Sequence, residues 1–307
     1  MDHDTDDAQS NPTIPVVIVG GGPVGLAAAL ELAHQGVASV VIEARPDVSW
    51  LRPRAKTTSA RTMEHFRRWG IADAIRERAP LKPSWSDEVV FCTTVLGREI
   101  TRFNQCFGLH LAHSELVSEG GQQAPQPLIE VVMRERATSL PTVDLITGAT
   151  VIAINQDADG VDVSLRDATG AVRTVRGQYA IGCDGARSLV RDAIGAILIG
   201  SDDSRPNFNM VFRSDSLAKR IPHGNAIHYW VLNPDQPGLV GPLDLNGQWW
   251  CIAMGVDHER DAINPVALVR NLLGDDDGEI PVEVIAVDWR VLAISTFAVI
   301  RFGDNDR

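Results

Sequence analysis

The sequence predicts an α/β fold with α+β elements, in which a doubly wound sheet is interleaved with a second, antiparallel sheet. Three observations predict this class. A short apolar run at Val16–Val19 leads directly into a glycine-rich turn and a helical pattern. Residues 143–183 contain several β-type segments separated by turn residues. Beyond Gly195 the chain is richer in Trp and Tyr and alternates again, which indicates a separate sheet-rich domain.

The first strand, helix and second strand form one crossover unit. Val16–Val19 is apolar and β-branched, which is typical of a parallel strand buried on both faces. Gly25–Gln35 is rich in strong helix formers, and Gly36 is placed to end that helix. Ser39–Glu43 then reads as the next strand. Strand, helix and strand within about 30 residues predict a right-handed βαβ unit.

The later segments alternate between the two sheets. A helix is expected over Ser59–Trp69, a strand over Val89–Leu96 with Glu99–Phe103 as its hairpin partner, and a helix over Leu128–Leu140. Strands over residues 143–146, 149–155, 161–165, 172–175 and 178–183 are expected to form an antiparallel meander that closes on a final buried strand. In the last region, His228–Val231 and Gln248–Ile252 read as strands, and Trp249 and Trp250 fit sheet packing or a pocket wall, with core packing favoured.

Composition and charge exclude several classes. The 307 residues, 44% of them hydrophobic, can bury one large core or two moderate ones. A formal net charge of −12 argues against a nucleic-acid partner, which needs a basic stripe. No apolar run approaches the about 20 residues of a membrane span, so we expect a cytoplasmic protein. The four scattered cysteines and eight histidines predict neither disulfides nor a metal site.

The glycine-rich turn carries the first chemical signal. Residues 20–25 satisfy the pattern G-x-G-x-x-G, directly after an apolar strand and at the start of a helix. Gly20 permits the tight turn, Gly22 lets the backbone approach a pyrophosphate, and Gly25 lets the helix pack close to the strand. Backbone N–H groups and the positive end of the helix then face the phosphates, with Pro23 and Val24 in the same turn.

Glu43 completes this dinucleotide site. It ends the second strand, where a carboxylate can accept hydrogen bonds from a ribose diol. The alternative is that residues 20–25 form a tight strand-to-helix turn that binds no ligand. The Rossmann-like motif alone does not separate flavin from nicotinamide.

A second motif favours flavin. Residues 179–191, with Asp184-Gly185, Ser188 and Arg191 in the expected spacing, resemble the Asp-Gly fingerprint of single-component (class A) FAD-dependent aromatic hydroxylases, the family of para-hydroxybenzoate hydroxylase and phenol hydroxylase. In that family the aspartate lies near the flavin ribityl chain and also serves the pyridine nucleotide. Taken without the family, the same residues are an ordinary turn with an N-cap.

The resemblance covers essentially the whole chain and implies further cofactor contacts. Arg45 lies in the arginine-bearing stretch that follows Glu43, and Arg54 begins a segment, 54–64, that resembles the family's loop beside the cofactor. Gln126 falls where a glutamine approaches the flavin, and Val151 where the backbone contacts adenine. Read alone, Arg54 is a solvated loop charge and Gln126 a polar residue at a helix start.

The resemblance also divides the chain into domains. We expect a disordered acidic tail over residues 1–12, an FAD-binding domain over 13–84 and 115–195, and a substrate-binding sheet domain over 85–114 and 196–295. Residues 296–307 would begin the return to the FAD domain. The family has a further Gly-Asp flavin segment, but Gly303-Asp304 is followed by polar residues, so we expect the chain to be truncated just short of it.

The implied function is hydroxylation of a phenolic ring. FAD would be reduced by NAD(P)H and would react with dioxygen to give a C4a-hydroperoxide, which transfers one oxygen atom to a small aromatic substrate. No catalytic base is assigned; His228 and Tyr229 are candidates that are more often structural. A nicotinamide-dependent Rossmann dehydrogenase and an inactive truncated flavoprotein fragment remain alternatives. The substrate, the choice of NADH or NADPH and the oligomeric state stay open.

Overall fold

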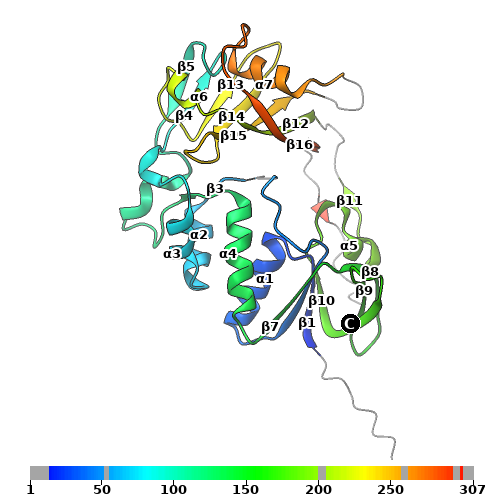
Figure 1. The fold of residues 1–307 in the computed structure, drawn as a ribbon. Coiled ribbons are helices and arrows are strands. Elements are labelled where there is room, and N and C mark those ends of the chain that lie inside the picture. The colour runs from blue at the N-terminus through cyan, green and yellow to red at the C-terminus, as the bar shows by residue number, and fades with distance from the viewer. Residues whose placement is uncertain (1–13, 52–54, 200–204, 257–261, 293–297, 300–307) are drawn as a thin grey trace, which may run out of the picture. The chain divides into compact units, whose positions relative to one another are not determined.

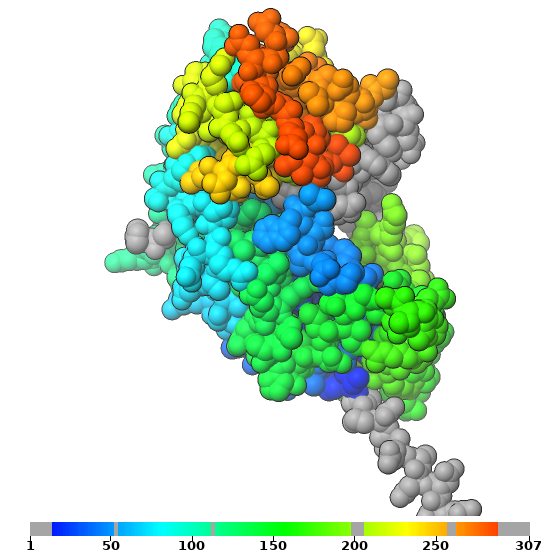
Figure 2. Space-filling model, viewed as in Figure 1, coloured from blue at the N-terminus to red at the C-terminus, as the bar shows by residue number. Residues whose placement is uncertain are grey.

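The chain forms two compact units. The structure, a computed structural model, describes residues 14–51, 55–199, 205–256, 262–292 and 298–299 (Figure 1). Figure 2 shows the molecule as a space-filling surface coloured along the chain. One unit contains Met133–Leu198 and the chain up to Val48, and the other contains Ser49–Val132 and Ile199–Ala298. The predicted domain boundaries, which divide residues by cofactor and substrate contact, stay a prediction.

The first unit is built on a six-stranded sheet with the order β7-β2-β1-β10-β9-β8 (Figure 1). Its strands are β1 (Ile14–Val19), β2 (Ser39–Glu43), β7 (Val143–Thr147), β8 (Thr150–Gln156), β9 (Val161–Arg166) and β10 (Val172–Gly182). β7, β2, β1 and the end of β10 run parallel, whereas β10, β9 and β8 pair antiparallel. The predicted doubly wound α/β class is confirmed.

The crossover unit forms for the reasons that the sequence gives. β1 buries Val17 and Ile18 completely, as a strand covered on both faces should. Helix α1 (Pro23–His34) begins at a proline, whose missing N–H is not needed in the first turn. Gly36 follows its end at a φ of 75°, a left-handed conformation that glycine adopts at little cost.

β10 differs from its prediction as two separate strands. It is one continuous strand that pairs with β9 over Val172–Gly177 and with β1 over Gly177–Gly182. Gly177 allows this change of partner, because a Cβ there would lie 2.7 Å from a methyl carbon of Val17. The expectation that its last part is buried is wrong, since Tyr179 is 68% exposed and none of the described segments covers it.

Three helices and two small ribbons complete the connections of both units. The helices are α2 (Ala60–Arg68), α4 (Gln126–Thr138) and α5 (Leu189–Ala193), and the 3-10 turn η3 (Gly185–Arg187) precedes α5. The ribbons are β3 (Thr57–Thr58) with β6 (Gln122–Gln123), and β11 (Leu198–Ile199) with β17 (Ala298–Val299). Ser59 caps α2 by accepting a hydrogen bond from the Thr62 N–H, which fixes where that helix begins.

The second unit contains a seven-stranded sheet with the order β16-β12-β15-β14-β13-β4-β5 (Figure 1). Its strands are β4 (Val89–Cys92), β5 (Glu99–Phe103), β12 (Arg205–Arg213), β13 (His228–Val231), β14 (Gly238–Pro242), β15 (Gln248–Met254) and β16 (Glu283–Leu292), and the remaining helices are α3 (Ala72–Arg78), α6 (Leu217–Arg220), α7 (Pro265–Leu273), η1 (Pro83–Trp85) and η2 (Cys106–His113). All neighbouring strands pair antiparallel except β13 and β4. The predicted antiparallel sheet is confirmed with that one parallel pair.

The strand predicted to run to Leu96 ends at Cys92. Beyond it the chain turns, and the Val95 and Leu96 N–H groups donate hydrogen bonds to the Leu272 and Leu273 carbonyl oxygens. These carbonyls end α7 and lack partners within the helix. Val95 and Leu96, which the alternating pattern assigned to the strand, therefore form backbone hydrogen bonds with the end of α7 instead.

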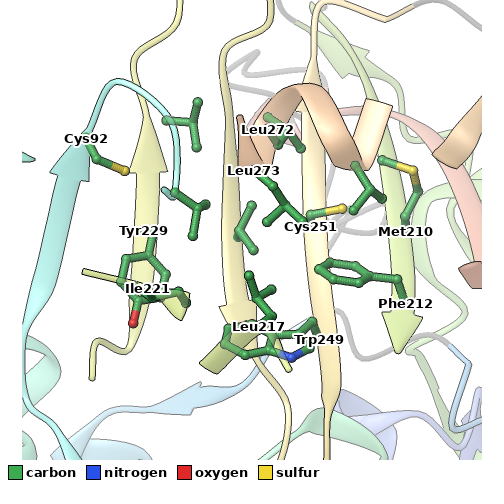
Figure 3. Close-up of a cluster of buried hydrophobic side chains, with 14 of the residues drawn as sticks. Cys92, Met210, Phe212, Leu217, Ile221, Tyr229, Trp249, Cys251, Leu272 and Leu273 are labelled. Atoms are coloured by element: carbon green, nitrogen blue, oxygen red, sulfur yellow. The ribbon is translucent and has the colours of Figure 1, made fainter. Parts of the chain in front are cut away.

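One face of this sheet packs on the helices and forms the main core. Figure 3 shows Tyr229, Trp249 and Cys251 from the strands against Leu272 and Leu273 of α7. Because successive side chains of a strand point to opposite faces, the residues next to these lie on the other face. That second face carries the polar residues described below.

Candidate functional site

The glycine turn lies between the ends of β1 and β10. Gly20 has a φ of 103°, and a Cβ on it would overlap the Cys183 carbonyl at the end of β10. A Cβ on Gly25 would overlap the Gly20 carbonyl oxygen. Gly22 is different, because its Cβ position meets no described atom within 4 Å. Two glycines are thus required by the turn itself, and the third leaves open space before α1.

Glu43 closes the turn from the side of β2. Its Oε2 accepts a hydrogen bond from the Gly21 N–H at 2.7 Å, and its Oε1 accepts two from Arg45, from N–H at 3.0 Å and Nε at 2.8 Å. Burial raises the pKa of Glu43, but these hydrogen bonds outweigh burial and hold the pKa below its usual value. A carboxylate has about four acceptor positions, so one remains for a ligand hydroxyl.

Asp184 is the centre of the second motif. Its Oδ1 accepts from the Ser188 hydroxyl at 2.5 Å, and its Oδ2 from the Val190 N–H at 3.2 Å. Ser188 in turn caps α5 by accepting from the Arg191 N–H at 3.0 Å, and Arg191 Nη1 donates to the Ala186 carbonyl at 2.9 Å. The spaced residues of this motif therefore form one connected turn.

The structure brings the residues of both motifs to one edge of the sheet. β2, β1 and β10 are neighbours and run parallel here, so Glu43, the glycine turn and Asp184 all follow carboxyl ends. The Cys183 N–H donates to the Val19 carbonyl at 2.7 Å, which joins the two motifs directly. Ligands of open α/β sheets bind at this edge, and the open position at Gly22 fits a pyrophosphate. The residues present thus fit a dinucleotide.

The other predicted cofactor residues are less closely gathered. Arg45 is half-exposed beside Glu43, and Val151 lies on β8, two residues after Ala149, whose N–H donates to the Glu43 carbonyl at 3.1 Å. Gln126 belongs to the second unit, where its Nε2 donates to Glu130 Oε1 at 2.8 Å. Arg54 and the Gly303-Asp304 pair lie outside the described residues.

A second group of polar residues lies on the sheet face opposite the core of the second unit. His228 and Trp250 contact edge-to-face with ring centroids 6.2 Å apart, and Phe107 contacts His228 in the same way at 5.3 Å. His228 Nδ1 and Trp250 Nε1 are buried without a hydrogen-bond partner among the described residues. Burial, and next the charge of Lys56, lower the pKa of His228 to about 3.

Tyr229, the other candidate base, belongs to the core. Its ring lies on the α7 face of the sheet (Figure 3). Its hydroxyl donates a hydrogen bond to the Gly224 carbonyl at 2.5 Å. Burial raises the pKa of Tyr229 well above its usual value. Tyr229 therefore has a structural role, and only His228 of the two lies on the sheet face opposite the main core.

Lys56 is the residue that the sequence interpretation missed. Its side chain is buried, with the residue 4% exposed, and its Nζ donates to the Pro242 carbonyl at 2.8 Å. Burial lowers the pKa of Lys56 well below its usual value. No sequence signal marks it, because a lysine in a polar segment is ordinarily exposed.

Comparisons with known proteins agree with this geometry. Residues 13–283 match the family described as FAD binding domain. The chain is 31% identical to 2,4-dichlorophenol 6-monooxygenase of Delftia acidovorans, over 90% of this chain and 49% of that protein. It is 31% identical to aklavinone 12-hydroxylase of Streptomyces peucetius, over 77% of this chain and 48% of that protein.

Solved structures of flavin-dependent monooxygenases are also similar to this chain. The flavin-dependent monooxygenase PieE, in complex with FAD and substrate, superposes with a TM-score of 0.82 and 28% identity over 95% of this chain and 51% of that chain. The chain spans about half the length of the relatives it matches. Within its described part, no helix combines the length and apolar character needed to cross a membrane. The family match covers most of the sequence, and the chain therefore belongs to the FAD binding domain family.

Proposed function

We propose that this chain forms the FAD-binding and substrate-binding part of an FAD-dependent, NAD(P)H-consuming monooxygenase that hydroxylates a phenolic ring. The observation that carries the proposal is the gathering of Gly20–Gly25, Glu43 and Asp184 at the carboxyl ends of three neighbouring parallel strands. The names of the relatives, which include dichlorophenol and phenol monooxygenases, support the substrate class.

Each residue at this edge has a proposed part in holding FAD. Gly22 and the first turn of α1 would present backbone N–H groups to the pyrophosphate, since no side chain caps that helix. Glu43 would accept a ribose hydroxyl at its remaining acceptor position, and Asp184 would lie near the ribityl chain. We extend the proposal to the neighbouring Pro23 and Val24, and to a set supported by the family resemblance: Arg45, Arg54, Gln126 and Val151.

The residues of the second unit would bind and orient the ring. The sheet face opposite the main core carries flat side chains, including Phe91 and Trp230, which stack with an interplanar angle of 9° at 6.0 Å and pack beside Leu109 of η2. Such a wall binds an aromatic ring and excludes water from it. When bound and reduced, FAD supplies the activation of dioxygen. One oxygen atom enters the ring, the other leaves as water, and NAD(P)H provides the hydride.

We also propose a cytoplasmic location, because NAD(P)H is supplied there. The four cysteines, all among the described residues, are free thiols, which fits a reducing compartment.

The test begins with the colour of the purified chain. We expect a yellow protein whose flavin absorbance survives gel filtration, and which oxidises NAD(P)H faster when phenols are added. Colourless protein that binds NAD but not FAD would overturn the proposal in favour of a dehydrogenase. Protein that retains FAD yet consumes no NAD(P)H with any phenol would leave the cofactor assignment and refute the activity of this chain.

A further inference from the structure

A cavity lies in the second unit, beside the start of β4. Its volume is about 560 Å³, and it is lined by residues 83–88 together with Leu109, His110 and Asn225. All of these residues belong to the second unit, so one compact body forms the whole cavity. Its volume is within the range of small-molecule sites, and none of the residues proposed to hold FAD lines it.

The wall formed by residues 83–88 is held in place by contacts with distant parts of the chain. The Ser86 hydroxyl donates a hydrogen bond to the Asn225 carbonyl at 3.0 Å. The Glu88 carbonyl accepts one from the Ile227 N–H at 2.8 Å. The wall therefore needs no ligand to hold its shape, and a ligand would meet a preformed site.

The unpaired negative charge of the lining lies on Asp87. The lining contains two carboxylates, Asp87 and Glu88, and neither lysine nor arginine. Glu88 Oε2 accepts a hydrogen bond from Arg102 Nη1 at 2.5 Å, and this ion pair neutralises the charge of Glu88. Arg102 also donates to both carboxylate oxygens of Glu99, at 2.9 and 2.6 Å, so its positive charge is already matched. Within the described part of the chain, the Asp87 carboxylate forms neither an ion pair nor a hydrogen bond.

The unpaired groups of the lining are open to solvent. Asp87 and Trp85 are both half-buried, and the Trp85 indole N–H likewise has no hydrogen-bond partner among the described residues. Neither the Asp87 carboxylate nor the Trp85 N–H belongs to the side-chain atoms that are sealed inside the protein. The Trp85 ring also stacks on no other ring of the described chain. Both side chains are therefore available to one ligand in the cavity.

We propose that this cavity binds an organic ammonium ion. The positive nitrogen lies beside the Asp87 carboxylate and the Trp85 ring, and the hydrocarbon part lies against Pro83 and Leu109. Opposite charges attract, and the face of an indole ring attracts a cation. An anion would meet the Asp87 carboxylate with no unpaired lysine or arginine beside it. A neutral alcohol gains a hydrogen bond but not the attraction between charges. Binding is reversible and is separate from the proposed hydroxylation.

The test titrates the full chain with three probes that share a cyclohexyl body, namely cyclohexylammonium, cyclohexanol and cyclohexanecarboxylate. This body has no aromatic ring, so the probes do not imitate a phenolic substrate. Isothermal titration calorimetry should show cyclohexylammonium binding about tenfold more tightly than cyclohexanol, and cyclohexanecarboxylate binding more weakly than either. Asp87→Asn removes the charge and keeps the shape of the side chain. It should weaken cyclohexylammonium binding by about tenfold and cyclohexanol binding by less than about twofold.

Asp144→Asn is the matched control, because it removes the same charge from an exposed position of β7 and should leave the three affinities unchanged. Trp85→Leu keeps an apolar side chain but loses the ring, and should weaken cyclohexylammonium binding by about twofold to fivefold. Circular dichroism checks that each variant is folded.

Three results would each overturn the inference. They are equal affinities of the unaltered chain for cyclohexylammonium and cyclohexanol, cyclohexylammonium binding that is undiminished in Asp87→Asn, and an equal loss of that binding in Asp144→Asn. If Asp87→Asn does not fold, Trp85→Leu decides, and undiminished cyclohexylammonium binding in that variant overturns the inference.

Discussion

Replacing Gly22 by alanine should separate folding from cofactor binding. Gly22 has a φ of −76° and a ψ of −174°, which alanine adopts freely, and its Cβ position is open in the folded chain. The substitution reduces the freedom of the unfolded chain, so the free energy of unfolding should rise by about 0.5 kcal/mol. The same methyl group would occupy the space assigned to the pyrophosphate. Losing one or two charge-assisted hydrogen bonds, roughly 1.5 to 3 kcal/mol, predicts FAD binding weaker by about tenfold to a hundredfold.

Two measurements on one preparation test this opposition. Urea unfolding of the cofactor-free chain gives the free energy of unfolding, and quenching of flavin fluorescence gives the dissociation constant of FAD. Gln35→Ala, in the exposed C-cap of the same helix, is the control and should leave FAD binding unchanged. FAD affinity that stays within a factor of two in Gly22→Ala would show that the pyrophosphate does not approach this residue.

Three further outcomes are expected. Glu43→Gln places an amide NH₂ against one of the N–H donors that the carboxylate now accepts from, so the free energy of unfolding should fall by about 1 to 3 kcal/mol. Asp144→Asn, at an exposed position of β7, is the control and should leave the free energy of unfolding unchanged. Equal urea midpoints for the two variants would contradict this expectation. Gly25→Ala brings a methyl group into the Gly20 carbonyl, so the thermal midpoint of the cofactor-free chain should fall together with FAD binding, and an unchanged midpoint would refute the reading of the turn. The pKa of His228 is about 3 when folded and near 6.5 when unfolded, so the unfolded chain takes up the extra proton as pH falls below 6.5. The free energy of unfolding should then fall by up to about 1.4 kcal/mol for each unit by which the pH is lowered. His228→Asn should make this pH dependence shallower. Parallel pH profiles of the free energy of unfolding for the variant and the unaltered chain would refute the prediction.

Much of the fold could be predicted because its signals are local. The run Val16–Val19 is apolar on both faces, and glycine spacing fixes the turn that follows it. Ser39–Glu43 was bounded correctly for the same reason. The residue types within each of these segments are therefore enough to predict its secondary structure.

The rest depends on contacts between segments distant in the chain. β10 is continuous because Gly177 can lie against Val17, a neighbour that no local pattern reveals. The strand from Val89 stops at Cys92 because the end of α7 needs hydrogen-bond donors. Lys56 is buried beside Gly241, and its Nζ donates to the Pro242 carbonyl; both residues are distant in the chain, so no local pattern predicts this burial.

The change of partner within β10 also orders the folding of the nucleotide site. β1 lies near the centre of its sheet, and Val19 pairs with Gly182 of β10. This pair can form only after the residues between the two strands have been synthesised. Pairing of such high sequence separation must repay the entropy of closing a long loop, and is slow. β8, β9 and the first half of β10, by contrast, form by local hairpins. During synthesis the meander can therefore form first and present the second half of β10 as the template on which β1 and its glycine turn complete the sheet.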